Sequence, residues 1–228
     1  MKISISQPAY LPWLGYFERI NYSDFHVVLN HVQMDASSKT KFINRNKIKT
    51  PNGWAWLTIP LVGNRKAKIS ELKMSSEKKW VHKHKTTIMQ NYCNSKYFHK
   101  YWPSMSSLFK PDNENLQPFI WNLTLYMLEV FKINTKFVFS SCYNIESNKS
   151  DLILDLCNYF KADQYLSGPL GKNYLDRQSF KSANVEIKFH NFQYGEYPQQ
   201  HGAYIKNLSA IDFLFNCGGE MFQQKYAK

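Results

Sequence analysis

Two amides and two cations stand side by side in the run Asn44-Arg45-Asn46-Lys47. Guanidinium and ammonium groups bind phosphate oxygens through charge-assisted hydrogen bonds, and a guanidinium can make two of them at once. We therefore predict that Arg45 and Lys47 hold the phosphates of a ligand and that the Asn44 amide stabilises a developing oxyanion. A solvated hairpin edge is the alternative explanation, because most surface cations have no ligand.

A histidine lies on a predicted helix together with an apolar and an aromatic residue. His84, Ile88 and Tyr92 follow one another at intervals of four and share one helix face, whereas His82 points elsewhere. An imidazole with an ordinary pKa, about 6.5, accepts a proton readily at neutral pH. We predict that His84 accepts a proton from an ammonium or a hydroxyl group and that Tyr92 lies in the same site. A histidine at the edge of the core, bonded to backbone, is the alternative.

The stretch from Gln7 to Gly15 is rich in proline and aromatic residues, in the order Gln-Pro-Ala-Tyr-Leu-Pro-Trp-Leu-Gly. Two prolines stiffen such a loop, so its amide, phenol and indole groups are held toward a ligand at little further cost in entropy. We predict that Gln7 shares the oxyanion role and that Tyr10, Trp13 and Trp56 flank a base or a sugar. Burial of Tyr10 and Trp13 in the core is the alternative.

A glycine-containing loop, Gly168-Pro169-Leu170-Gly171-Lys172, follows a predicted strand and precedes a helix. Backbone N–H groups in such a place bind anions, so Lys172 is predicted to hold a phosphate. The loop lacks the spacing of a P-loop or of dinucleotide-binding folds. The four cysteines are scattered and no Gly-x-Ser-x-Gly elbow is present, so we expect neither a bound metal nor a covalent acyl-enzyme.

Alternating strand and helix signals predict the elements that must position these residues. A strand over 2–6, a helix around 11–20 and a strand over 25–29 form a βαβ unit, which favours a parallel sheet. A hairpin follows, with a turn at 51–53 and a strand over 54–61. The other predicted elements are helical segments over 76–109 and 118–131, a strand over 136–140, a helix over 151–162 capped by Ser150, a strand over 164–167, a short helix through Phe180, a strand over 185–189, and a terminal helix that begins at Ser209 and ends at Gly218-Gly219.

These elements predict an α/β fold, with a mostly parallel central sheet, flanking helices, an inserted basic β-hairpin and a helical segment. The loop after the first strand then lies at the carboxyl edge of the sheet, where open α/β sheets bind ligands. We expect a single domain over 1–228 with an uneven charge. Residues 1–110 carry 18 Lys and Arg against 5 Asp and Glu, and residues 111–228 carry 11 against 12, which gives +13 and −1.

The composition and the length of the apolar runs argue against a disordered chain and against a membrane-spanning protein. With 43% hydrophobic residues, 16 Phe, 15 Tyr and 6 Trp, the chain has ample material for a folded core. No apolar run approaches the roughly 20 residues that cross a bilayer, and no charged leader with an apolar segment begins the chain. We therefore expect a cytoplasmic protein without a membrane span.

The motifs taken together resemble the WbqC-like family of bacterial proteins. Its most characteristic stretch is matched by residues 5–17, Ile-Ser-Gln-Pro-Ala-Tyr-Leu-Pro-Trp-Leu-Gly-Tyr-Phe. Asn30-His31 stands where the family commonly carries acidic residues. The resemblance spans nearly the whole chain, through Val32-Gln33, Phe42 with residues 44–48, residues 53–60, His84 with Tyr92 and Phe98, Ser167-Gly168 with Tyr174-Leu175, and Leu208-Ser209 with Ile211-Asp212.

The resemblance implies a place among the genes for surface polysaccharide, above all the O-antigen of lipopolysaccharide, and a modification of nucleotide-linked amino sugars. Our leading hypothesis is a transferase that attaches an acyl or aminoacyl group to the amine of a nucleotide-linked deoxyamino sugar. It needs no cofactor beyond a donor such as aminoacyl-tRNA, acyl-CoA or an acyl carrier protein. The alternatives are a nucleic-acid-binding module for RNA or tRNA, or a non-catalytic protein of polysaccharide assembly. The hypothesis requires the N-terminal turn and the basic hairpin to meet in one cleft.

Overall fold

A computed structural model describes residues 1–34, 42–64 and 66–226 of the chain. Its centre is a five-stranded sheet in the order β7-β2-β1-β8-β9, in which every neighbouring pair is parallel. The predicted α/β fold with a parallel central sheet is therefore confirmed. The strand order reverses between β1 and β8, because the chain first builds outward to β7 and then returns to the other side of β1. The strands are β1 (Lys2–Ser6), β2 (Phe25–Val28), β7 (Lys136–Phe139), β8 (Gln164–Ser167) and β9 (Glu186–Phe189).

Helices cover both faces of the sheet, so successive strand residues are buried on alternate sides. On one face Ile5 and Val27 pack against α5 (Lys149–Tyr159) and α6 (Arg177–Ser182). On the other face the ring of His26 lies 6.2 Å from that of Tyr16 in α1 (Leu14–Asn21). Trp121 of α4 (Leu116–Val130) packs edge-on against two phenylalanines of β7 on the same side.

A two-stranded hairpin stands apart from the sheet. β3 (Arg45–Thr50) and β4 (Gly53–Thr58) pair antiparallel, and Gly53 has a φ of +102°, which suits a residue without a β-carbon. The predicted hairpin and its turn are confirmed. Strand alternation buries Asn46 and Ile48 and places Arg45 and Lys47 on the outer face.

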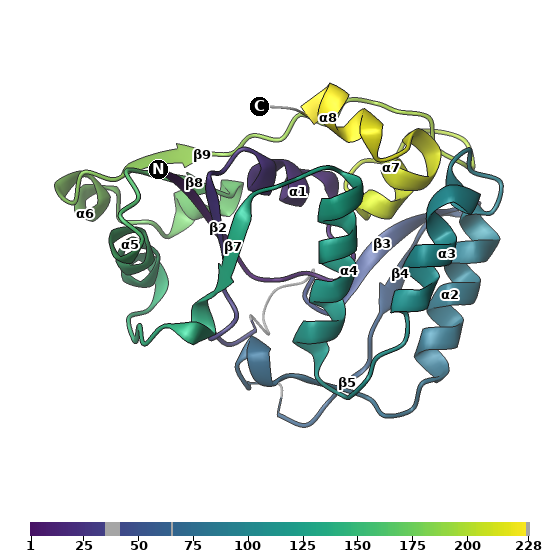
Figure 1. Cartoon of the computed structure of the whole chain (residues 1–228), viewed down its shortest axis with the longest axis horizontal. Helices are drawn as coiled ribbons and strands as arrows, with labels where there is room; N and C mark the ends of the chain where they lie inside the picture. The colour runs from purple at the N-terminus through teal and green to yellow at the C-terminus, as the bar shows by residue number, and fades with distance from the viewer. Residues whose placement is uncertain (35–41, 65, 227–228) are drawn as a thin grey trace.

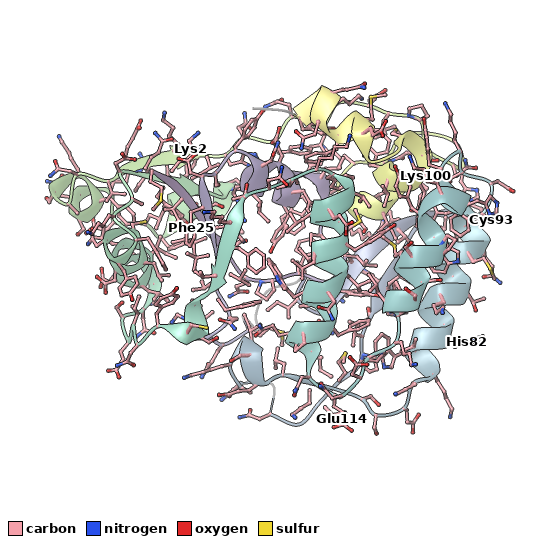
Figure 2. All side chains as sticks on the ribbon, in the orientation of Figure 1. Lys2, Phe25, His82, Cys93, Lys100 and Glu114 are labelled. Carbon is pink, nitrogen blue, oxygen red and sulfur yellow. The ribbon has the colours of Figure 1, made fainter. Side chains whose placement is uncertain are left out.

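A second group of elements surrounds the hairpin and shares an apolar core with it. The predicted helical segment over 76–109 proves to be two helices, α2 (Lys79–Tyr92) and α3 (Phe98–Leu108). In Figure 1 these helices stand together beside the hairpin, whereas α5 and α6 lie at the opposite end of the molecule. Side chains fill the space that the ribbon leaves between β7 and α4 (Figure 2). The remaining elements are β5 (Leu61–Val62), η1 (Ile69–Glu71), β6 (Lys73–Met74), η2 (Ser140–Cys142), η3 (Pro169–Asn173), α7 (Ala210–Cys217) and α8 (Glu220–Tyr226).

The predicted capping residues are confirmed at the ends of α7, whereas the cap predicted for α5 is not. Ser209 caps α7 as predicted, since its hydroxyl accepts a hydrogen bond from the Ile211 N–H. Gly218, at a φ of +83°, ends α7, and α8 follows it as a second terminal helix. The prediction of Ser150 as a cap was wrong. Asn148 occupies that position, and the Ser150 hydroxyl instead accepts a hydrogen bond of 2.8 Å from the N–H of Asp176. None of the helices formed by the described residues is long and apolar enough to span a bilayer.

Candidate functional site

A cavity of about 930 Å³ opens at the carboxyl ends of β1 and β8. Its walls come from residues 6–9 after β1, residues 168–171 after β8, and the side chains of α1 that face them. Open α/β sheets bind ligands at the point where the strand order reverses, because the loops from the two neighbouring strands diverge there and leave a crevice. The cavity thus lies where the topology places a ligand site. A smaller hollow of about 480 Å³ lies beside α6 and β9.

Arg19 brings a cation to this cavity from the last turn of α1. Its Nη1 lies against Gly168, on the side where a β-carbon would stand, and its Nε is buried without a hydrogen-bond partner. Over residues 1–34, 42–64 and 66–226, no carboxylate pairs with this guanidinium. Lys149, the exposed first residue of α5, adds a second cation to the wall. Because the half-buried Arg19 guanidinium has a buried Nε and no carboxylate partner among the described residues, the site is suited to an anion.

A row of polar side chains lies beneath Arg19 on the face of the sheet that α1 covers. The Ser4 hydroxyl lies 2.8 Å from His26 Nδ1, and the Ser6 hydroxyl lies 3.5 Å from His26 Nε2. Burial, reinforced by the charge of Arg19, lowers the pKa of His26 to about 3. The imidazole is therefore neutral at pH 7, and it holds the Ser6 hydroxyl at the cavity wall.

Aromatic rings form another part of the wall. Trp13 packs on Phe42 with ring centres 4.9 Å apart, and both line the cavity. Burial raises the pKa of Tyr16 to about 12 and raises that of Tyr174, so both phenols stay protonated. The Tyr16 hydroxyl is buried beside the Ser6 side chain. Aromatic walls, phenol donors and a cation together suit a ligand that combines a flat ring with a phosphate.

Some residues of the N-terminal turn line the cavity, and others are buried in the core. Gln7 and Trp13 line the cavity, as the prediction of binding residues in this turn requires. Tyr10 is fully buried, and its hydroxyl lies 2.8 Å from Nδ1 of His84. The prediction that Tyr10 flanks a base or sugar is therefore corrected, because its ring is enclosed between α2 and α4 rather than exposed to the cavity.

The structure also corrects the role predicted for His84. Its side chain is 3% exposed, packs between the rings of Tyr10 and Trp80, and is not among the described residues that line the cavity. Burial lowers the pKa of His84 to about 4, so the imidazole is neutral at pH 7. His84 joins α2 to the N-terminal turn and does not contact a ligand in this cavity. His82 is exposed on the outer side of α2 (Figure 2).

Tyr92 and Asn44 likewise hold the fold together. The Tyr92 hydroxyl donates to the Asp212 carboxylate at 2.9 Å and accepts from the Lys49 N–H at 2.9 Å. The Asn44 amide donates to the carbonyl of Ile59 at 2.8 Å. Both side chains are buried, so the predicted oxyanion role of Asn44 and ligand contact of Tyr92 are corrected to structural ones.

The carboxylate of Asp212 is the centre of a buried network that sequence reasoning missed. It also accepts a hydrogen bond of 2.8 Å from the Tyr197 hydroxyl, and its burial raises its pKa to about 6. The buried ammonium of Lys49 donates to Gln199 at 3.2 Å and to the carbonyl of Ala203. Burial lowers the pKa of Lys49, and the charge of Asp212 opposes that effect. These contacts attach the hairpin to α7.

The basic residues of the hairpin stack on tryptophans outside the cavity. The guanidinium carbon of Arg45 lies 4.3 Å from the ring centre of Trp56, and the ammonium of Lys47 lies 4.1 Å from that of Trp54. The Tyr10 N–H donates to the carbonyl of Phe42 at 2.9 Å. The Asn46 amide of the hairpin donates to the carbonyl of Leu11 at 2.7 Å, so the N-terminal turn and the hairpin are in contact, but the hairpin cations do not share the cleft that the hypothesis requires. Within the described part of the chain, the cavity wall includes Phe42 but not Arg45, Lys47 or Trp56.

Lys172 is exposed at the end of the loop whose residues 168–171 line the cavity. Its ammonium lies 5.5 Å from the ring centre of Phe189 and is absent from the described cavity wall. The glycines of the loop line the cavity, whereas its lysine does not, so phosphate binding by the loop stays a prediction. No group of three His, Cys, Asp or Glu side chains is arranged to hold a metal ion among the residues that the structure describes.

Asn30 and His31 form hydrogen bonds at the ends of β2 and β7. The Asn30 amide donates to Gln117 at 2.7 Å and to the Ser141 hydroxyl at 2.9 Å. His31 Nδ1 lies 2.6 Å from the Ser140 hydroxyl. This network ties the two strand ends to α4.

Comparisons with known proteins agree with the motifs. The model of the WbqC-like protein family matches residues 7–224. Uncharacterized protein Rv1507c of Mycobacterium tuberculosis is 27% identical over 223 residues, which are 96% of this chain and 95% of that protein. No solved structure matches the chain. Because the family match runs from the N-terminal turn into the last helix, the chain belongs to the WbqC-like protein family.

Proposed function

We propose that this protein is a transferase that attaches an acyl or aminoacyl group to the amine of a nucleotide-linked deoxyamino sugar. The product would serve the synthesis of O-antigen or another surface polysaccharide, and the reaction would take place in the bacterial cytoplasm. The donor would be an aminoacyl-tRNA, an acyl-CoA or an acyl carrier protein. The nucleotide-linked sugar would occupy the cavity at the carboxyl ends of β1 and β8.

The cation of Arg19 is the observation that carries this proposal. It faces the cavity without a carboxylate partner among the described residues, and it lies against the Gly168 backbone. A diphosphate placed there would accept charge-assisted hydrogen bonds from the guanidinium. The cavity volume of about 930 Å³ falls within the range of small-molecule sites.

The remaining walls support the other parts of such a ligand. Trp13 and Phe42 offer ring surface for a base, and the exposed Tyr174 offers a phenol donor for a sugar hydroxyl. Gln7 lines the cavity after β1, and its amide N–H would donate to the oxyanion that forms when the amine attacks. Removing one such donor costs roughly 3–4 kcal/mol of transition-state stabilisation.

The transfer itself forms one bond and breaks one. The sugar nitrogen forms a C–N bond to the donor carbonyl carbon, and the C–O or C–S bond to the donor breaks. The nitrogen loses a proton, and the departing oxygen or sulfur gains one. In this proposal the Ser6 hydroxyl, held by His26 at the cavity wall, takes the place first predicted for His84 in passing that proton.

Binding and turnover test the proposal separately. We expect a dTDP-linked amino sugar to bind the purified protein in isothermal titration calorimetry, and mass spectrometry to show an added acyl or aminoacyl mass on the sugar. Arg19→Gln should weaken binding about 10- to 150-fold, because hydrogen bonds to charged groups contribute about 1.5–3 kcal/mol. Arg177→Gln is the matched control, since the exposed Arg177 lies on α6 outside this cavity.

The outcomes separate the functional classes. Equal affinity of the wild-type protein and Arg19→Gln would contradict the assignment of the site. Arg19-dependent binding without product, across the three donor classes, would favour a non-catalytic protein of polysaccharide assembly.

A further inference from the structure

The outer face of the hairpin carries cations and indoles in two adjacent rows, which we call the cation–aromatic face: Arg45 and Lys47 on β3, and Trp54 and Trp56 on β4. Side chains two residues apart on a strand point to the same side, so each row has one orientation. Each cation stacks on an indole at about the distance of a cation–π contact, 4.3 Å for Arg45 on Trp56 and 4.1 Å for Lys47 on Trp54.

Part of this face is covered and part is accessible. Lys49 continues the row of cations, but it is buried under Gln199 and Ala203. Trp54, beside it, is 44% exposed, which is unusual for so large an apolar ring. The fold thus covers Lys49 and leaves the Trp54 ring exposed, with Arg45, Lys47 and Trp56 half-buried near it.

The cation–aromatic face leads to the cavity through a continuous series of rings. The ring centres of Trp54 and Trp56 are 5.7 Å apart, and those of Trp56 and Phe42 are 6.3 Å apart. Phe42 in turn packs on Trp13, and both rings line the cavity. A chain of stacking groups lying on the hairpin would therefore end at the cavity mouth.

We infer that the cation–aromatic face binds the single-stranded end of an RNA. Bases stack on exposed aromatic rings whatever their sequence, and phosphates bind the cations between them. The net charge of +13 on residues 1–110 favours such a polyanion. An acidic carrier protein would use the cations but would leave the indoles without a stacking partner. Binding of RNA is independent of the transferase activity, and delivery of an aminoacyl group into the cavity rests on the proposed function.

Fluorescence anisotropy of a labelled single-stranded RNA octamer, titrated with the full chain, tests the inference. We expect Trp54→Ala to weaken binding about 5- to 150-fold, as loss of one stacked base would, and Trp54→Phe to retain most of the affinity. Tyr159→Ala is the matched control, because Tyr159 is 58% exposed on α5, away from the hairpin. Lys47→Gln should lower the slope of log K against log salt by about 0.7, the share of one phosphate contact.

Three results would overturn the inference: equal affinity of Trp54→Ala and the wild-type protein, equal binding of a blunt RNA duplex, or displacement of the RNA by polyglutamate at equal charge. The last result would indicate an acidic protein partner. Thermal melts of the variants separate lost binding from lost folding. Calorimetry with the dTDP-linked sugar, run on the same preparations, keeps the two proposals apart, because Trp54 lies outside the cavity wall and Arg19 lies within it.

Discussion

Substitution of Gly168 offers the sharpest test of the cavity, because one added methyl group would displace its cation. Gly168 has φ −67° and ψ 166°, an extended conformation that alanine adopts without strain. A β-carbon at this position would occupy the place of Arg19 Nη1. The obstacle is the far end of a flexible side chain, so in Gly168→Ala we expect the guanidinium to move and the backbone to stay.

The expected effects on binding and on stability have opposite signs. Moving the guanidinium would remove one charge-assisted contact to the ligand, worth about 1.5–3 kcal/mol, so the dissociation constant of a dTDP-linked sugar should rise about 10- to 150-fold. Replacing glycine by alanine at a compatible position restricts the unfolded chain and stabilises a protein by about 0.4–1 kcal/mol. Gly168→Ala should therefore bind the sugar more weakly and unfold at an equal or higher urea concentration.

Isothermal titration calorimetry and urea unfolding measure both effects on the same samples. Gly195→Ala is the matched control, because its added β-carbon would lie 3.9 Å from the Lys225 ammonium, an ordinary contact. If Gly168→Ala binds the sugar as tightly as the wild-type protein, the Arg19 guanidinium does not hold the ligand where we place it. If instead the variant unfolds early, the contact between α1 and the loop after β8 is structural.

Two further predictions concern the buried polar groups. Burial raises the pKa of Asp212 from 3.8 to about 6, so the folded protein holds this proton more tightly and the free energy of unfolding should fall by about 2 kcal/mol from pH 4 to pH 6. Asp212→Asn should flatten this fall in urea titrations, and an unchanged slope would contradict the assignment. His84→Phe should cost about 1–3 kcal/mol of stability by leaving the Tyr10 hydroxyl unpaired, while sugar binding in calorimetry stays unchanged. Lost turnover with intact stability would instead restore His84 as the base.

Local patterns in the sequence were sufficient for most of the secondary structure. The strand over 2–6, the hairpin turn before Gly53 and the Ser209 cap follow from alternation, turn residues and capping, which depend on neighbours within a few positions. The mistaken Ser150 cap shows the limit of such signals. That hydroxyl accepts a hydrogen bond from the N–H of Asp176, the residue before α6, a contact that no local pattern contains.

The same limit applies to the candidate site, where local patterns identified some of the cavity residues and missed others. The unusual composition after β1 drew attention to Gln7 and Trp13, which line the cavity, whereas it did not show that Tyr10 points into the core. His84 was assigned chemistry from its ordinary pKa, but the packing of α2 removed its access to solvent. Arg19 carried no local signal at all.

Short-range periodicity and composition are enough to predict the elements, the parallel sheet and the basic character of residues 1–110. They do not predict which cation lies at the cavity, because that depends on long-range packing. Arg19 faces Gly168 only because β8 returns to the side of β1 opposite β2, which brings the loop after β8 beside α1. Burial and charge pairing arise from such long-range packing, so the same residue types become ligand groups in one place and structural groups in another.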